Sequence, residues 1–401
     1  MSLLTLLFLP VAAGAQTGPE DGGPDPANVK VRIGPLMLNP RIEVPNIGVD
    51  TNVFNQTADQ NPKKDFTATV SPITDLWLRV GRSWFRASIR EDLVWFQTYA
   101  SERSANAFYT VGWRMPFNRL VFDVEPDYVS TRDRPGFEID ARSQRTEWGA
   151  KSSVQVRVLS KTFLGVTASR VTTDFDSFAT FDGVNLREAL NRTVSTAGIV
   201  VKHQLTPLTT ISLNIDREQD RFQFSPERDS NSTAFSGTVT FDPHALLKGN
   251  ASFGYRDFQP VLPGLPPYQG PTMGGTLTYT LLGTTQFGFQ FQRDVGYSYD
   301  VTQPYYVQTG VSGSMSQQIF GPFDAVVRAG TQQLAYRDQA GVTVDVPNRT
   351  DYVRSFGGGV GYHFSSGLRI GFNVDQQHRI TDVAQFRYDG LRYGTSVTYA
   401  F

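Results

Sequence analysis

The last sixteen residues of the chain, FRYDGLRYGTSVTYAF (Phe386 to Phe401), alternate between two kinds of side chain. In an extended strand, one face would carry Leu391, Tyr393, Thr395, Val397, Tyr399 and Phe401, and the other Gly390, Arg392, Gly394, Ser396, Thr398 and Ala400. One face is therefore aromatic and apolar, and the other is small and polar. This pattern predicts a closing β-strand, either of a bacterial outer-membrane barrel or of a soluble β-sandwich.

The terminal aromatic residue also suggests how such a barrel would be assembled. The last strand of an outer-membrane barrel closes the sheet, and aromatic side chains form girdles at the membrane interface. We therefore predict that Phe401 and Tyr399 belong to an assembly signal that the outer-membrane insertion machinery reads.

The same alternation recurs along the chain and favours one of the two folds. Apolar and polar residues alternate in residues 285–294, in residues 368–375 and around residues 208–216. Arg, Asp and Asn side chains on one face of so many strands would be costly in a dry core, but a water-filled lumen removes that cost. A soluble sandwich of this size would also expose its sheet edges. The sequence therefore favours a transmembrane barrel.

Turn signals separate these alternating segments. Eight connections have the composition of tight turns, such as Gly81-Arg82, and nine have that of longer polar loops, such as residues 132–141. In outer-membrane barrels, short turns face the periplasm and longer loops face the exterior. We predict an all-β fold, a transmembrane antiparallel β-barrel of about 18 strands, with 16 strands as the alternative, short periplasmic turns and longer extracellular loops.

Composition limits the functions that such a barrel could have. The formal net charge of the 401 residues is −1, which gives no support for binding nucleic acid. The chain has no cysteine, so disulfides, thiolate metal sites and a lipoprotein anchor are excluded. No phosphate-binding glycine loop and no zinc-ligand spacing occurs, and we expect no cofactor and no metal.

The first residues have the features of a secretion signal. Residues 3–11 form an apolar run that is too short to span a bilayer, and Ala13-Gly14-Ala15 fits a cleavage site, although no Lys or Arg precedes the run. Residues 16–27 are rich in Gly, Pro and acidic residues. We predict a signal peptide over residues 1–15, a flexible periplasmic leader over 16–35 and an outer-membrane barrel over 36–401.

The segment after the leader carries a family resemblance. Asp50-Thr51-Asn52-Val53-Phe54 would end a first strand, Ser71-Pro72 lies in the middle of the next, and Tyr99 ends the hairpin that follows. This D-x-N-V-F, S-P and x-x-Y order resembles the β-barrel porins of Gram-negative outer membranes. The resemblance implies fold and location more firmly than it implies a solute, since some relatives are associated with exopolysaccharide secretion and others are called porins.

Alternation also predicts which charged side chains face the lumen. These are Arg86, Arg90, Asp92, Asp123, Glu125, Lys151, Arg157, Asp216, Arg328, Arg369, Asp375, Arg379 and Arg392. Opposed charges across a pore create a transverse field that sorts solutes by size and sign. Alternatively, the charges pair with one another and stabilise the wall. Because both signs are present, we do not expect a dedicated anion or cation pore.

Two local features carry further expectations. Seven aromatic residues flank predicted tight turns and are expected to form a periplasmic girdle: Trp77, Trp84, Phe85, Trp113, Phe117, Phe320 and Phe323. Gly357-Gly358-Gly359 is expected to mark a bend or a bulge in one strand.

The function predicted first is a porin-like pore for passive passage of small hydrophilic solutes. The alternatives are an export component for an exopolysaccharide and a structural or adhesive barrel plugged by its own loops. We do not expect an enzyme, because no G-x-S-x-G stretch is present, and His203, His244 and His363 would lie near the periplasmic ends while His378 would face lipid. The expected partners are outer-membrane lipid, the insertion machinery, and small solutes or polysaccharide, without nucleic acid.

Overall fold

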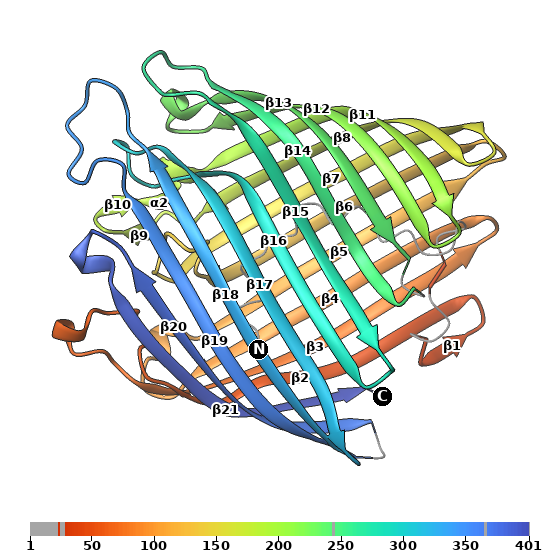
Figure 1. Cartoon of the computed structure of the whole chain (residues 1–401), viewed down its shortest axis with the longest axis horizontal. Helices are drawn as coiled ribbons and strands as arrows, with labels where there is room; N and C mark the ends of the chain where they lie inside the picture. The colour runs from red at the N-terminus through yellow and green to blue at the C-terminus, as the bar shows by residue number, and fades with distance from the viewer. Residues whose placement is uncertain (1–22, 25–28, 243–244, 365–366, 401) are drawn as a thin grey trace.

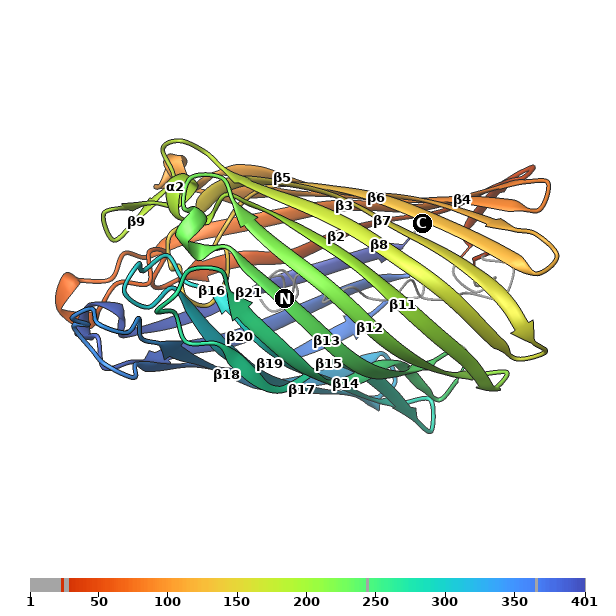
Figure 2. The same ribbon diagram turned by 90° about the horizontal axis from the view of Figure 1, so that it is seen from above.

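The computed structural model describes residues 23–24, 29–242, 245–364 and 367–400. The predicted signal peptide, most of the predicted leader, His244 and Phe401 lie outside these residues. The strands wind into one closed barrel, and the longer loops gather at one end of it (Figures 1 and 2).

Eighteen antiparallel strands of 12 to 17 residues form the wall. They are β2 (Leu36–Asp50), β3 (Asp65–Val80), β4 (Ser83–Phe96), β5 (Ser104–Pro116), β6 (Leu120–Asp133), β7 (Ser143–Leu159), β8 (Thr162–Phe175), β11 (Arg192–Thr206), β12 (Thr209–Phe222), β13 (Ser230–Phe241), β14 (Leu247–Pro260), β15 (Tyr268–Leu281), β16 (Thr285–Tyr297), β17 (Tyr305–Phe320), β18 (Phe323–Arg337), β19 (Thr350–His363), β20 (Leu368–Ile380) and β21 (Tyr388–Ala400). Each strand pairs with the barrel strands before and after it in the chain, and β21 pairs with β2. The predicted barrel and its leading strand count of 18 are confirmed.

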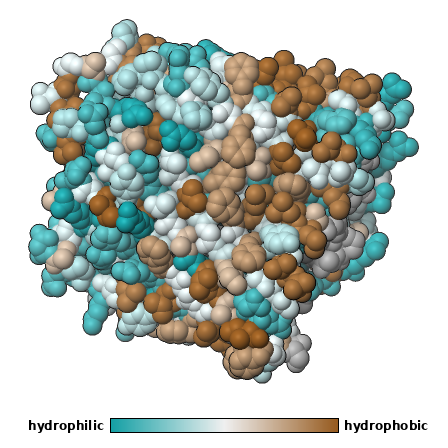
Figure 3. Space-filling model, in the orientation of Figure 1, coloured by the Kyte–Doolittle hydropathy of each residue, from teal (hydrophilic) through white to brown (hydrophobic). Residues whose placement is uncertain are grey.

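Successive side chains of each strand face the outside and the lumen in turn. On β12, Leu213 and Ile215 are 61% and 51% exposed, whereas Ser212, next to Leu213, is 8% exposed. Such a large exposed apolar surface is suited to lipid and not to water. Apolar side chains gather over the strands and polar ones at the loop end (Figure 3).

Short turns join the strands at one end of the barrel. The turn at Gly81-Arg82 joins β3 to β4, and Gly81 has a φ of 62°, a conformation that a two-residue hairpin turn requires and glycine adopts freely. A small additional strand, β1 (Val31–Ile33), pairs with the first three residues of β2. This strand lies within the span predicted as a periplasmic leader, residues 16–35.

Nine longer connections lie at the other end, and we number them in chain order. They are L1 (51–64), L2 (97–103), L3 (134–142), L4 (176–191), L5 (223–229), L6 (261–267), L7 (298–304), L8 (338–349) and L9 (381–387). They contain short elements only: η2 (Ala58–Gln60), η3 (Ala100–Glu102), β9 (Thr180–Phe181), β10 (Val184–Asn185), α2 (Leu186–Leu190), η4 (Pro226–Arg228) and η5 (Ala384–Phe386). No helix in the described ranges is long and apolar enough to cross a membrane.

The predicted aromatic girdle is wrong for two of its seven members. Phe85 and Trp113 stack on the outer face with ring centroids 5.7 Å apart, as a girdle requires. Trp77, however, pairs in register with the inward-facing Arg86, and Trp84 is buried on the inner face under the guanidinium of Arg79. A position beside a short turn does not decide the direction of a side chain, because that direction reverses at each residue.

The predicted bulge at Gly357-Gly358-Gly359 is also absent. β19 keeps an unbroken register with β18 and with β20 through all three glycines. A Cβ atom on Gly357 would lie 1.9 Å from Oδ1 of Asp375, so glycine is needed there to make room for a neighbouring carboxylate.

Candidate functional site

Loops from nearly opposite sides of the barrel meet across its mouth. Nε2 of Gln385 in L9 lies 3.3 Å from both carboxylate oxygens of Asp182 in L4, and the rings of Phe181 and Phe386 stack with centroids 5.6 Å apart. Along the wall, the eight strands β12–β19 separate β11 from β20, and the six strands β2–β7 separate β21 from β8. The contact between L4 and L9 therefore crosses the mouth of the barrel.

A small apolar core holds this cover together. Its buried members come from L3, L4, L7, L9 and the end of β8: Ile139, Phe175, Ala179, Leu186, Ala189, Leu190, Tyr299 and Phe386. Removal of apolar side chains from water is the main favourable contribution to such packing. The loops thus form a packed cover and do not depend on polar contacts alone.

L3 is braced against the wall by Arg379 of β20. The guanidinium is fully buried, and its Nη1 donates to the backbone oxygen of Glu138 at 2.9 Å and to the carboxylate of Asp140. Its Nη2 donates to Oδ2 of Asp351 at 2.6 Å, and Arg349 also donates to that carboxylate. A buried charge is stable only when it is paired and hydrogen-bonded, so this arrangement holds L3 in an inward position.

Glu138 connects L3 to L7. Its Oε1 accepts a hydrogen bond from Ser298 Oγ at 2.6 Å, and its Oε2 accepts one from the backbone N–H of Tyr299 at 3.3 Å. Burial raises the pKa of Glu138 to about 7, although the hydrogen bond from Ser298 and the nearby Arg349 and Arg379 act in the opposite direction. This loop carboxyl group therefore titrates near neutral pH.

The D-x-N-V-F segment ties together L1, L3 and β21. Asn52 is 1% exposed, and its side-chain Nδ2 donates to the backbone oxygens of Gln56 at 2.8 Å and of Asp389 at 2.9 Å. Its Oδ1 accepts from the backbone N–H of Gln56 at 2.8 Å. The backbone oxygen of Val53 accepts from Nη2 of Arg134 at 2.7 Å, which links L1 to the inward loop L3.

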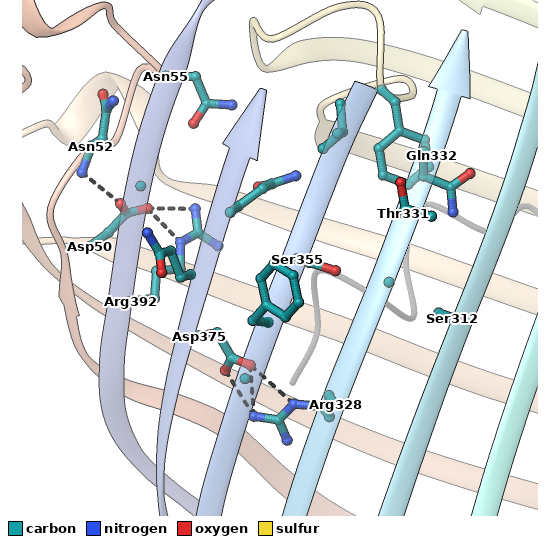
Figure 4. Close-up of a pocket in the computed structure, with 18 residues that line it drawn as sticks. Asp50, Asn52, Asn55, Ser312, Arg328, Thr331, Gln332, Ser355, Asp375 and Arg392 are labelled. Carbon is teal, nitrogen blue, oxygen red and sulfur yellow. Dashed lines mark hydrogen bonds and ion pairs between the residues drawn. The ribbon is translucent and has the colours of Figure 1, made fainter. Parts of the chain in front are cut away.

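An open cavity lies on the inner face of β17 to β21, with Phe137 of L3 among its lining residues, and its volume of about 970 Å³ includes open solvent. Two ion pairs form part of its wall (Figure 4). Arg328 contacts Asp375 at 2.8 Å across β19, and Nε of Arg392 donates to Oδ2 of Asp50 at 2.7 Å across the junction of the first and last strands.

The charged residues singled out from the sequence form several clusters on the inner face. Arg86 contacts Asp123 at 3.3 Å and Glu125 at 2.6 Å, and Arg90 contacts Asp92 at 2.9 Å. The remaining placements are as follows: Arg328 with Asp375, Arg369 with Asp324, Arg379 with Asp140 and Asp351, Arg392 with Asp50, Arg157 over the ring of Phe163, Lys151 on β7 and Asp216 on β12. Most of these charges lie against an opposite charge. This arrangement resembles the alternative in which the charges pair with one another and stabilise the wall.

Sequence reasoning missed the loop residues that shape the mouth. Glu138, Asp182 and Gln385 lie in L3, L4 and L9, where no two-residue alternation assigns a direction to a side chain. Asn52 could have been identified as a candidate residue from the sequence, because it lies in the D-x-N-V-F motif.

Several solved outer-membrane proteins align in structure with most of this chain at low sequence identity. OccK2 (OpdF) of Pseudomonas aeruginosa, solved in complex with glucuronate, is 10% identical, with 91% of this chain and 98% of that chain covered and a TM-score of 0.49. A BenF-like porin from Pseudomonas fluorescens Pf-5 is 12% identical, with 91% and 98% covered and a TM-score of 0.48. OccAB3 of Acinetobacter baumannii is 10% identical, with 91% and 99% covered and a TM-score of 0.47. Among curated proteins, none is significantly similar in sequence.

The family assignment rests on a match that spans almost the whole chain. Residues 25–401 match the model of the family described as "Putative beta-barrel porin 2". The matched region includes all eighteen strands of the closed barrel, with its lipid-facing apolar surface. The short turns accordingly face the periplasm and L1 to L9 face the exterior. The chain belongs to this family of β-barrel porins and is an integral pore protein for small solutes in the Gram-negative outer membrane.

Proposed function

We propose that this barrel passes small hydrophilic solutes by passive diffusion through a pore that its own loops make narrow. The observation that carries this proposal is the contact between L4 and L9 across the mouth, through Asp182 and Gln385. An 18-strand barrel without such loops would leave a wide aqueous channel. Here solutes would have to pass beside the packed cover, so size would be the first criterion of passage.

The charges of the wall would act as a second and weaker criterion. Arg86, Arg328 and Arg369 each lie within 3.3 Å of a carboxylate, which reduces the field that an isolated charge would produce in the lumen. We therefore propose weak ion selectivity, set by the small local differences between paired charges.

Swelling of proteoliposomes in sugars of increasing size tests the narrow pore. Wild-type protein should admit glycerol and pentoses quickly and trisaccharides slowly. Phe386→Ala removes the ring that stacks on Phe181 and should speed the entry of larger sugars. Phe178→Ala is the matched control, because Phe178 in L4 is 89% exposed and adds little to the packing. Equal rates for all sugars in the wild type would contradict a narrow pore.

One alternative has a specific observation in its favour. The same packed cover, with buried residues such as Leu186 and Tyr299, suits a structural or adhesive barrel that its loops plug completely. Liposomes that contain folded protein but admit no solute and no ions would favour this alternative. Export of an exopolysaccharide, the other alternative from the sequence, has no separate support from the loop geometry.

We also propose that the protein acts without catalysis. Among the described histidines, His378 pairs with Asp389, His363 with Asp324, and His203 with the hydroxyl of Thr162. These partners leave the three described imidazoles without the serine contact that a hydrolase of the Ser-His type requires. Incubation of the folded barrel with phospholipid and with ester substrates, followed by product analysis, tests this proposal.

A further inference from the structure

We propose that the cavity on β17 to β21 binds a neutral, multiply hydroxylated solute such as a monosaccharide or disaccharide on its way through the barrel. This inference rests on the proposed pore function, because it names the class of solute that the pore would take. It comes from the charge, the spacing and the free hydrogen-bonding groups of two rows of side chains that cross the wall side by side.

The first row is charged but neutral in sum. Register places Arg328, Gly357, Asp375, Arg392 and Asp50 at paired positions on five neighbouring strands. Two guanidinium groups and two carboxylates therefore share one level of the wall, and each guanidinium contacts a carboxylate. Because the row is neutral in sum, it gives no net attraction to a solute ion of either sign, whereas a hydroxyl group can hydrogen-bond to such a pair without breaking it.

The second row offers neutral groups that are free to bind. Its paired positions are Gly330, Ser355, Gln377 and Gly390, on β18 to β21. Ser355 and Gln377 are directly paired on the adjacent strands β19 and β20. The Cβ atoms of such a pair lie roughly 5 Å apart. No hydrogen bond to another described residue engages the Ser355 hydroxyl or the Gln377 amide, and both line the cavity. A hydroxyl and an amide at this spacing can each donate to and accept from neighbouring sugar hydroxyls.

Glycines on both sides keep this second row accessible. At Gly330 a Cβ atom would lie 3.0 Å from the hydroxyl oxygen of Ser355, and a larger side chain would cover it. At Gly390 the nearest atom to a Cβ would be 3.8 Å away, so the space beside Gln377 is open. Glycine at these two positions is what leaves Ser355 and Gln377 uncovered from the lumen side.

The cavity also has an apolar side. Phe137 of L3 is a lining residue and packs against the cluster of Tyr306, Leu334 and Tyr336. Pockets for small molecules combine apolar and aromatic surface with a few placed polar groups. A sugar ring has this same division, because its hydroxyl groups point outward from the ring edge and its C–H groups form an apolar face that an aromatic ring can contact. Figure 4 shows Ser355, Gln332 and the two ion pairs on neighbouring strands around the cavity.

Ligand-observed NMR on the refolded full chain in detergent tests this site. The probes are glucose, its anionic relative glucuronate and its cationic relative glucosamine, which all keep the pyranose ring and differ mainly in charge. We expect saturation transfer to glucose, and weaker transfer to both ions. Ser355→Ala/Gln377→Ala should weaken glucose binding roughly tenfold, because two hydrogen bonds are lost. The barrel should still assemble, since neither side chain has a hydrogen-bond partner among the described residues to lose. Ser169→Ala, a serine on the inner face of β8 outside the cavity, is the control and should bind as the wild type does.

The outcomes separate this site from the pore itself. Equal binding by the double variant and the wild type, or stronger binding of glucuronate or glucosamine than of glucose, would overturn the inference. Ion conductance of the same wild-type sample in a planar bilayer reports the pore independently. A conducting barrel that binds no glucose would overturn the sugar site and leave the pore standing. A silent barrel would overturn the pore, while the NMR comparison would still decide the sugar site.

Discussion

Arg379 donates a hydrogen bond of 2.9 Å to the backbone oxygen of Glu138, a residue 241 positions earlier in the chain. This contact joins β20 to L3, which starts on the far side of the β2–β21 junction. Together with the carboxylates of Asp140 and Asp351, it fixes the inward position of L3. The narrow mouth therefore depends on a buried ion-pair network as well as on apolar packing.

Removal of the brace should loosen L3. Arg379→Gln leaves Asp140 and Asp351 without their shared partner, and breaking a buried pair costs about 3–5 kcal/mol. We expect much faster amide hydrogen exchange in residues 134–142 and unchanged exchange in the strands of the wall. Arg157→Gln, on the inner face of β7, is the control. Unchanged exchange in L3 would show that Arg379 does not hold the loop.

Loop packing should depend on pH through Glu138. Burial raises its pKa from the ordinary value of 4.5 to about 7, so the packed state holds a proton that the released loop loses between these values. The free energy that favours packing is therefore greatest below pH 4.5 and falls as pH rises to about 7, by up to about 1.4 kcal/mol per pH unit.

Single-channel recording at several pH values checks this dependence. We expect fewer and shorter open periods at pH 5 than at pH 8. Glu138→Gln, which is neutral at every pH, should remove most of the difference, whereas Glu188→Gln in α2 should keep it. The same pH dependence in Glu138→Gln as in the wild type would assign the effect to another group.

Asn52 should contribute strongly to stability at the junction of the first and last strands. Asn52→Ala leaves the backbone groups of Gln56 and Asp389 without their partners, at about 1–3 kcal/mol for each buried group. Heat-modifiable migration on a gel should show unfolding at a lower temperature. Asn39→Ala, on the preceding strand β2, should behave as the wild type. Identical transitions for all three proteins would contradict this role.

Wall charges should affect ion selectivity when a pair is broken. In Arg86→Gln, Glu125 loses its partner at 2.6 Å, whereas Asp123 keeps Arg114 at 2.5 Å. The reversal potential in a KCl gradient should shift toward cation selectivity, because the lumen gains an uncompensated carboxylate. The double variant Arg86→Gln/Glu125→Gln should return to the wild-type value. A shift toward anions would mean that Glu125 does not face the ion path.

Assembly in cells should require the terminal aromatic residue. Phe401 lies outside the described residues, but Tyr399 pairs in register with Ile42 and Leu368 on the strands to either side of β21. Deletion of Phe401 should lower the amount of folded barrel in outer-membrane fractions, and Phe401→Tyr should restore it. Normal insertion without Phe401 would contradict the proposed signal.

The wall could be predicted from the sequence because its pattern is local. A two-residue period and turn signals are sufficient to give the strand count and to place Arg86 opposite Phe85. Their distance from a turn predicts a girdle position for Trp77 and Trp84, but the register shows that both side chains point inward.

The mouth could not be predicted in this way. Contacts such as Gln385 with Asp182 and Arg379 with Glu138 join residues more than 200 positions apart. Their formation depends on the closure of the barrel and on the shape of every loop at that end, neither of which a local pattern contains. The D-x-N-V-F motif is the one local signal, because its Asn52 joins L1 to Asp389 of β21.

Single-channel conductance of the refolded full chain, compared with that of Arg379→Gln, tests the loop-narrowed pore most directly. We expect small, stable steps from the wild type, well below those of an unobstructed barrel of 18 strands, and larger and more variable steps from Arg379→Gln. Large steps from the wild type that Arg379→Gln leaves unchanged would contradict a pore narrowed by L3 and its neighbours.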